Sequence, residues 1–111
     1  MTIRKWQNKI HQLACEKGWW HEMEDAEDRI PEALLLIHAE ISEAVEDYRS
    51  GNMDLLHQDN GKPIGFPSEL ADAVIRILDL CDALDIDLEH IIALKHEYNK
   101  TRSYKHGNKK I

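Results

Sequence analysis

Residues 34–48 (LLLIHAEISEAVEDY) have two distinct faces when they are read as a helix. One face is apolar, because hydrophobic side chains recur at steps of three and four and form a stripe suited to packing against another helix. The apolar stripe comprises Leu34, Ile37, Ile41, Val45 and Tyr48. A neighbouring stripe carries Glu40, Glu43 and Asp47. Carboxylates at this spacing repel one another in an isolated helix, and a divalent cation is the simplest way to offset that repulsion.

Residues 68–84 repeat the arrangement. Their apolar stripe comprises Leu70, Val74, Ile77, Cys81 and Leu84, and their polar stripe comprises Glu69, Asp72, Arg76 and Asp79. If the two apolar stripes pack together as antiparallel helices, Glu40, Glu43, Glu69 and Asp72 can converge. An all-carboxylate set suits Mg²⁺ or Mn²⁺ better than zinc. The alternative is that both acidic stripes are solvated outer faces. Within the second helix we expect Asp79 to pair with Arg76.

The remaining signals predict an all-α protein, a four-helix bundle in one domain of residues 1–111. Nothing alternates with period two, so no strand is expected. The helices are expected over residues 2–17, 31–50, 68–85 and 87–102, with an acidic loop at 22–28 and a long linker at 51–67. Residues 103–111 should form a basic, flexible tail. The boundary signals are Thr2, Ser68 and Asp87 as N-caps, Pro31 in a first turn and Gly18 as a stop. Narrow apolar stripes and Trp6 on the first helix favour a homodimer or homotetramer.

The net charge of −7 is unevenly distributed. From Lys95 onward there are six Lys or Arg and one acidic residue, a net +5, so the preceding residues carry −12. An acidic body argues against nucleic acid as the main partner. Neither a membrane segment nor a lipidation motif is visible. Cys15 and Cys81 lack redox or metal spacing, so we expect reduced thiols in a cytoplasmic protein that is intact from Met1.

The E-x-x-E and E-x-x-D pairs resemble the signature of the all-α nucleoside triphosphate pyrophosphohydrolases, the MazG-like family with its dCTP pyrophosphatase and dimeric dUTPase relatives. Lys95, Asn99 and Arg102, in K-x-x-x-N-x-x-R, resemble the segment after that family's fourth helix, and His106-Gly107 followed by Lys109 resembles its basic tail. The resemblance implies hydrolysis between the α- and β-phosphates of a nucleoside triphosphate, with deoxynucleotides favoured and pool sanitation as the role. It also implies a dimeric or tetrameric protein.

The resemblance and the chemistry of the side chains together predict three groups of site residues. Glu40, Glu43, Glu69 and Asp72 would be the catalytic metal ligands for Mg²⁺, with Mn²⁺ as a substitute, and one of them would act as general base. Lys95, Asn99 and Arg102, with Lys100 nearby, would contact the phosphates. Trp19 and Trp20 would stack on the nucleobase, or one of them would close the end of the bundle.

Two other classes of function are open to a chain of this kind. A ferritin-like di-iron site needs E-x-x-H on two helices, and the sequence contains no E-x-x-H. A non-catalytic oligomeric module of the same fold, which binds nucleotides or partners without turnover, is the stronger alternative. An assay for pyrophosphate release in the presence of magnesium distinguishes the enzyme from the module.

Overall fold

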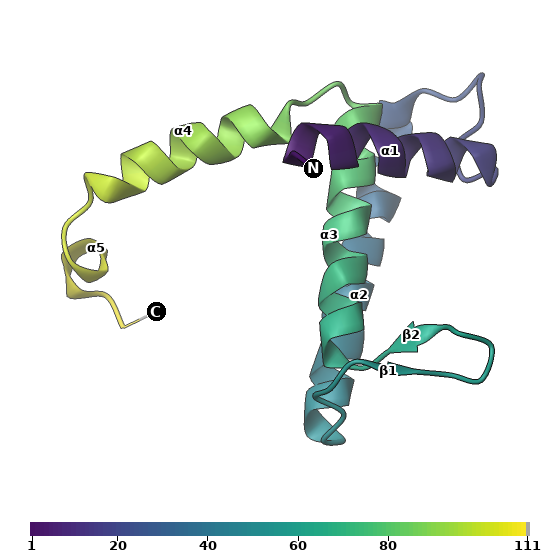
Figure 1. Ribbon diagram of the computed structural model, residues 1–111. Helices are drawn as coiled ribbons and strands as arrows, with labels where there is room; N and C mark the ends of the chain where they lie inside the picture. The colour runs from purple at the N-terminus through teal and green to yellow at the C-terminus, as the bar shows by residue number, and fades with distance from the viewer. Residues whose placement is uncertain (111) are drawn as a thin grey trace.

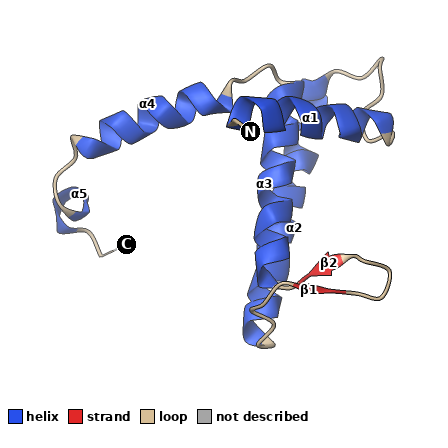
Figure 2. Ribbon diagram, viewed as in Figure 1, coloured by secondary structure: helices blue, strands red, loops and turns tan. Residues whose placement is uncertain are grey.

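The computed structural model describes residues 1–110, and most of them are helical (Figures 1 and 2). The helices are α1 (Ile3–Glu16), the 3-10 turn η1 (Ala26–Arg29), α2 (Ile30–Arg49), α3 (Phe66–Ala83), α4 (Leu88–Lys100) and the single turn α5 (Lys105–Asn108). The predicted all-α class is therefore confirmed. No described helix combines the length and the apolar composition that a membrane crossing requires.

The capping signals at three helix ends are confirmed. The Thr2 hydroxyl accepts a hydrogen bond from the Lys5 N–H (3.1 Å), and an Asp87 carboxylate oxygen accepts one from the His90 N–H (3.3 Å). Both side chains satisfy amide groups that the first turn of a helix leaves without partners. Gly18 follows α1 with a φ of +85°, a left-handed conformation that ends the helix at little steric cost.

The linker between α2 and α3 differs from the prediction. It holds a short antiparallel hairpin, β1 (Leu56–His57) with β2 (Pro63–Ile64), where no strand was expected. Two-residue strands are too short to leave a period-two pattern in the sequence. The prediction that Ser68 caps α3 is also wrong, because the helix already begins at Phe66 with Gly65 as its N-cap. Pro67 lies in its first turn, and the Ser68 hydroxyl donates to the Pro63 carbonyl (3.2 Å).

α2 and α3 lie side by side and antiparallel, and α1 crosses the end at which α2 begins and α3 ends (Figure 1). Ala44 and Ala73 are both buried in this pair. The acidic face of α2 turns inward with Ala44, so that Glu40 is buried, whereas Ile41, Val45 and Val74 are about half exposed. Cys81 of the predicted apolar stripes is buried, but these three side chains are not, so the two stripes do not pack on each other along their whole length within one chain. Small alanines let the acidic faces approach, and much of the apolar surface is left outside.

α4 departs from the rest of the chain. It leaves the end of α3 beside the N-terminus and points away from the α2–α3 pair (Figure 1), and none of its described side chains is buried. The radius of gyration is 16.7 Å, against about 13 Å for a compact domain of roughly this length. A single chain thus supplies four long helices without closing them into a bundle.

Candidate functional site

The four predicted metal ligands lie on facing sides of α2 and α3. Glu40 and Glu43 come from consecutive turns of α2, and Glu69 and Asp72 come from the first turns of α3. One carboxylate oxygen each from Glu40, Glu43 and Glu69 lies within 4.8 Å of the other two. Burial raises the pKa of Asp72, and the charges of Glu40 and Glu43 raise it further, so Asp72 lies near these two carboxylates. The structure therefore brings three of the four predicted ligands into one cluster and places Asp72 near it.

Burial and the neighbouring carboxylates together perturb Glu69. Its removal from water raises its pKa from 4.5 to about 7, with further contributions from hydrogen bonding to Glu43 and from the charges of Glu43, Asp72 and Glu40. Its Oε2 atom is buried and has no hydrogen-bond partner among the described residues, and the same is true of Oδ2 of Asp47, one turn beyond Glu43. A buried carboxylate oxygen without a partner is costly, and a bound cation would satisfy it. These residues fit a hard divalent cation.

Two cations lie beside the carboxylates, and the sequence prediction missed both. Arg76 Nε donates to Glu40 Oε1 at 2.9 Å, so the predicted Arg76–Asp79 pair is wrong. The partner of Arg76 lies on α2 because the two helices face each other with their polar stripes. Lys62, in the hairpin, is near enough to Asp72 for its charge to lower the pKa of that carboxyl group, against the larger effect of burial. The only sequence signal for Arg76 was its place on the acidic stripe, and Lys62 had none.

Asp79 instead joins α3 to α1 and to the loop that follows α1. Its carboxylate lies 2.7 Å from His11 Nδ1 and accepts from Trp20 Nε1 at 3.0 and 3.1 Å. The His11 and Trp20 rings meet edge to face, with centroids 5.5 Å apart. The Arg29 guanidinium stands 5.0 Å from the centre of the Trp20 ring on another side. Trp20 is thus fixed by contacts from three separate elements.

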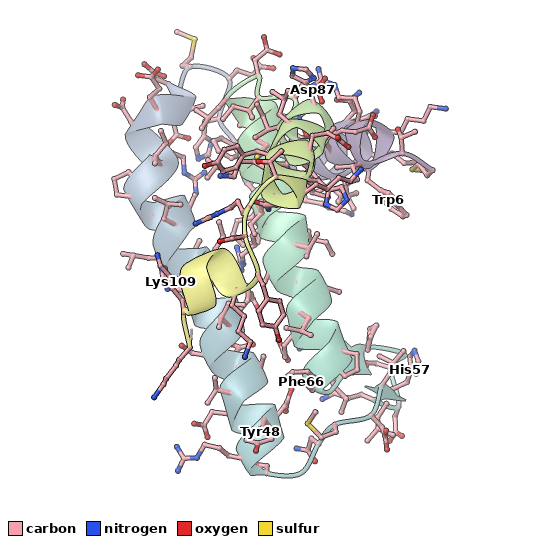
Figure 3. All side chains as sticks on the ribbon, turned by 90° about the vertical axis from the view of Figure 1, so that its left-hand side faces the viewer. Trp6, Tyr48, His57, Phe66, Asp87 and Lys109 are labelled. Carbon is pink, nitrogen blue, oxygen red and sulfur yellow. The ribbon has the colours of Figure 1, made fainter. Side chains whose placement is uncertain are left out.

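A pocket of about 570 Å³ is lined by the three tryptophans and by two of the predicted metal ligands. These residues are Trp6, Trp19, Trp20, Glu40 and Asp72. Its other walls are mainly apolar; they include Ile10, Leu13, Leu36, Ile75 and Leu80. Trp6 extends from α1 beside α3 (Figure 3), and Trp19 remains 66% exposed. A planar apolar group and a multiply charged group could therefore occupy one continuous site.

The predicted phosphate contacts on α4 are not brought to this site within one chain. Lys95 Nζ on α4 and the guanidinium of Arg102, two residues beyond the end of α4, lie 5.9 and 6.0 Å from the centre of the Tyr98 ring, so both cations stand beside this ring. Lys100 is bound to Glu97 at 2.8 Å. Among the described residues no ion pair joins Lys95 or Arg102 to the four carboxylates, because α4 points away from them. Asn99, on the same helix, shares this placement.

The chain matches no known protein family, no curated protein and no solved structure with which it was compared. The chemistry of the carboxylate cluster, the pocket and the α4 cations must therefore carry the functional conclusion by itself.

Proposed function

We propose that the chain is a Mg²⁺-dependent nucleoside triphosphate pyrophosphohydrolase that yields a nucleoside monophosphate and pyrophosphate. The observation that carries the proposal is the carboxylate cluster, whose member Glu69 has a buried oxygen without a partner among the described residues, beside an aromatic pocket of about 570 Å³ that Glu40 lines. A pocket of this size and composition is typical of small-molecule sites. Carboxylate clusters bind a magnesium triphosphate through the metal, and the apolar walls would accept the base.

The residues would divide the work by charge. Glu40, Glu43, Glu69 and Asp72 would hold Mg²⁺, or Mn²⁺ in its place. The ion, once bound, would neutralise phosphate charge and lower the pKa of an attacking water. Arg76 lines the pocket, and Lys62 lies close to Asp72, so both would donate to phosphate oxygens that the ion leaves free. A carboxylate left free by the ion would accept the proton of the water.

The aromatic end of the pocket would hold the nucleobase. Trp20 presents a fixed ring because Asp79 and Arg29 hold it, and Trp6 and Trp19 stand around the same space. Base–aromatic stacking contributes about 1–3 kcal/mol per base. We propose deoxynucleotides as the favoured substrates and removal of unwanted nucleotides from the cytoplasmic pool as the role. A homo-oligomer would complete the four-helix bundle that one chain leaves open.

The test is a product assay with a matched pair of variants. Wild-type protein is incubated with canonical and modified nucleoside triphosphates and Mg²⁺ or Mn²⁺, and monophosphate is resolved from diphosphate. Glu43→Gln should reduce turnover by more than about 100-fold. Loss of a metal ligand should lower activity at least as much as loss of a residue that only orients a ligand. Glu46→Gln is the control, since Glu46 is exposed on the same helix and pairs with Arg49 at 3.4 Å.

Two results would contradict the proposal in different ways. Wild-type rates in Glu43→Gln and in Glu69→Gln would remove the metal site. Binding of a magnesium triphosphate without release of pyrophosphate from any substrate would leave the non-catalytic binding module. Circular dichroism of each variant shows whether its helices have formed.

A further inference from the structure

Cys15, His11 and Asp79 form a line of contacts that runs from the surface of α1 to α3. Cys15 follows His11 by four residues, so both side chains lie on the same side of α1. Cys15 Sγ lies 3.5 Å from His11 Nε2, and His11 Nδ1 lies 2.7 Å from Asp79 Oδ1. A nucleophile within hydrogen-bond reach of a base, with the base oriented by a third group, is an arrangement that activates thiols. We call these three residues the thiol triad.

The contacts of Asp79 determine where the protons lie in the thiol triad. An ionised carboxylate only accepts hydrogen bonds, so Nδ1 of a neutral His11 ring donates to Asp79. Trp20 Nε1, which can only donate, bonds the two oxygens of the same carboxylate at 3.1 and 3.0 Å and holds it in place. The other ring nitrogen of His11, Nε2, is then free to accept a proton, and it is the nitrogen that faces the thiol.

The thiol end of the triad is open to small molecules, whereas the base and the carboxylate are more protected. Cys15 is exposed, and the side chains of His11 and Asp79 are each 21% exposed. The second cysteine of the chain, Cys81, is buried in α3. Of the two thiols, the accessible one is therefore the one with a base beside it.

Acidic groups from α1 and α3 surround the thiol and determine which reagent it suits. Partial burial raises the pKa of the Cys15 thiol, and the charges of Asp79, Asp82 and Glu16 raise it further. The thiol therefore keeps its proton at neutral pH, and a base must remove that proton before the sulfur can attack. The more basic a thiolate is, the stronger it is as a nucleophile. The same acidic groups attract a cationic reagent and repel an anionic one.

We propose that Cys15 is a site of thiol–disulfide exchange with small cationic disulfides, with His11 as its base and Asp79 as the residue that positions the base. His11 Nε2 takes the proton of the thiol, and Sγ attacks one sulfur of the disulfide. A bond forms between these two sulfurs, the disulfide bond of the reagent breaks, and the departing thiolate takes the proton from His11. Cys15 is thereby oxidised to a mixed disulfide, and half of the reagent is reduced to a thiol. This site is independent of the proposed hydrolysis of triphosphates.

The test measures how fast cystamine, a small cationic disulfide, modifies the protein. Mass spectrometry of the intact protein and of its peptides follows the mixed disulfide and assigns it to a cysteine. Cys15 should be modified first, and Cys15→Ser should leave only slow modification of Cys81. At pH 7, His11→Ala should react at least about tenfold more slowly than the wild type, and Asp79→Asn should also be slower. His21→Ala is the matched control, because His21 is exposed and lies outside the triad, and it should react at the wild-type rate.

The pH dependence of the rate distinguishes a base from a histidine that only supports the fold. Hydroxide removes the thiol proton at high pH, so the difference between His11→Ala and the wild type should shrink from pH 7 to pH 10. A difference that stays constant over this range, or equal rates at pH 7, would overturn the proposal. Faster modification of Cys81 than of Cys15 would remove the site, and a faster reaction with oxidised glutathione, which is anionic, would remove the preference for cationic disulfides. Circular dichroism at each pH checks that the variants are folded.

Discussion

At the residue scale, the carboxylate of Asp79 contacts side chains from two other parts of the chain. It accepts from the Trp20 indole and contacts His11, and it lines the pocket on the α3 side. Trp19 and Trp20 look alike in the sequence, yet only Trp20 has its indole N–H engaged among the described contacts, and Trp19 is largely exposed. The two neighbouring tryptophans therefore have different roles, and the spacing of residues in the sequence could not have predicted this difference.

The difference between the two tryptophans predicts the effect of replacing each with phenylalanine. Trp20→Phe keeps an aromatic ring and removes the hydrogen bond to Asp79, so it should lower the free energy of unfolding by about 1–2 kcal/mol. It should also raise KM for a nucleoside triphosphate severalfold with little change in kcat, because the ring is no longer held against the pocket. Trp19→Phe is the matched control and should change stability little. Urea denaturation and initial rates measure both quantities, and equal effects of the two substitutions on stability would contradict the assignment.

At the scale of elements, features set by neighbouring residues, such as helix ends, could be predicted from the sequence. Features set by contact with another element could not. Thr2, Asp87, Pro31 and Gly18 fixed helix ends correctly, because each acts on amide groups or backbone angles within a few residues of itself. The carboxylate cluster was predicted because each of two helices carries a pair of carboxylates, and these pairs meet when the helices pack antiparallel.

Three features could not be read from periodicity, since it identifies the faces of a helix and not which face meets a neighbour. Arg76 was assigned to Asp79 three residues away, although it bonds Glu40 across the helix pair. The inward position of Glu40 accompanies the burial of Ala44 and Ala73, and these alanines carry no strong sequence signal. The departure of α4 depends on the buried Gln7, a polar residue that looks like surface in a sequence.

The hairpin and α3 meet at Gly65, and the crowding there predicts that replacing this glycine with alanine lowers the free energy of unfolding. Gly65 has a φ of +106°, and a Cβ atom there would lie 2.1 Å from the Asp54 carbonyl oxygen. Gly65→Ala must therefore displace the hairpin or the first turn of α3, which carries Glu69. Gly61→Ala is the control, because Gly61 also has a positive φ (+86°) but open space around it. We expect Gly61→Ala to cost about 1 kcal/mol and Gly65→Ala at least twice as much, measured by urea denaturation. Equal costs would show that the contact with Asp54 is readily relaxed.

At the scale of the whole molecule, the chain has acidic side chains between helices and large apolar side chains on its surface, which is unfavourable for an isolated monomer. Three carboxylates, those of Glu40, Glu43 and Glu69, are gathered where two helices face each other, and large apolar side chains lie outside on the same helices. Each half of this arrangement is unfavourable unless something is added, a cation for the carboxylates and a protein surface for the apolar faces. One chain therefore carries two requirements that its own described residues do not meet, and the proposed metal ion would meet the first of them.

The first of these requirements predicts an unusual dependence of stability on pH. The folded-state pKa of Glu69 is about 7, above its value of 4.5 in a model peptide, and the pKa of Asp72 is raised as well. Between these two pKa values the folded chain binds more protons than the unfolded chain, so stability falls as pH rises. In the presence of a chelator the melting temperature should be highest near pH 5 and should decrease through pH 7. Mg²⁺ binds the deprotonated carboxylates, so the stabilisation it gives should grow over the same range and cancel the decline. Glu69→Gln should flatten the pH profile measured with chelator, and Glu46→Gln should leave it unchanged. A metal-free protein whose melting temperature rises from pH 5 to pH 7 would show that burial and the neighbouring carboxylates do not hold Glu69 protonated.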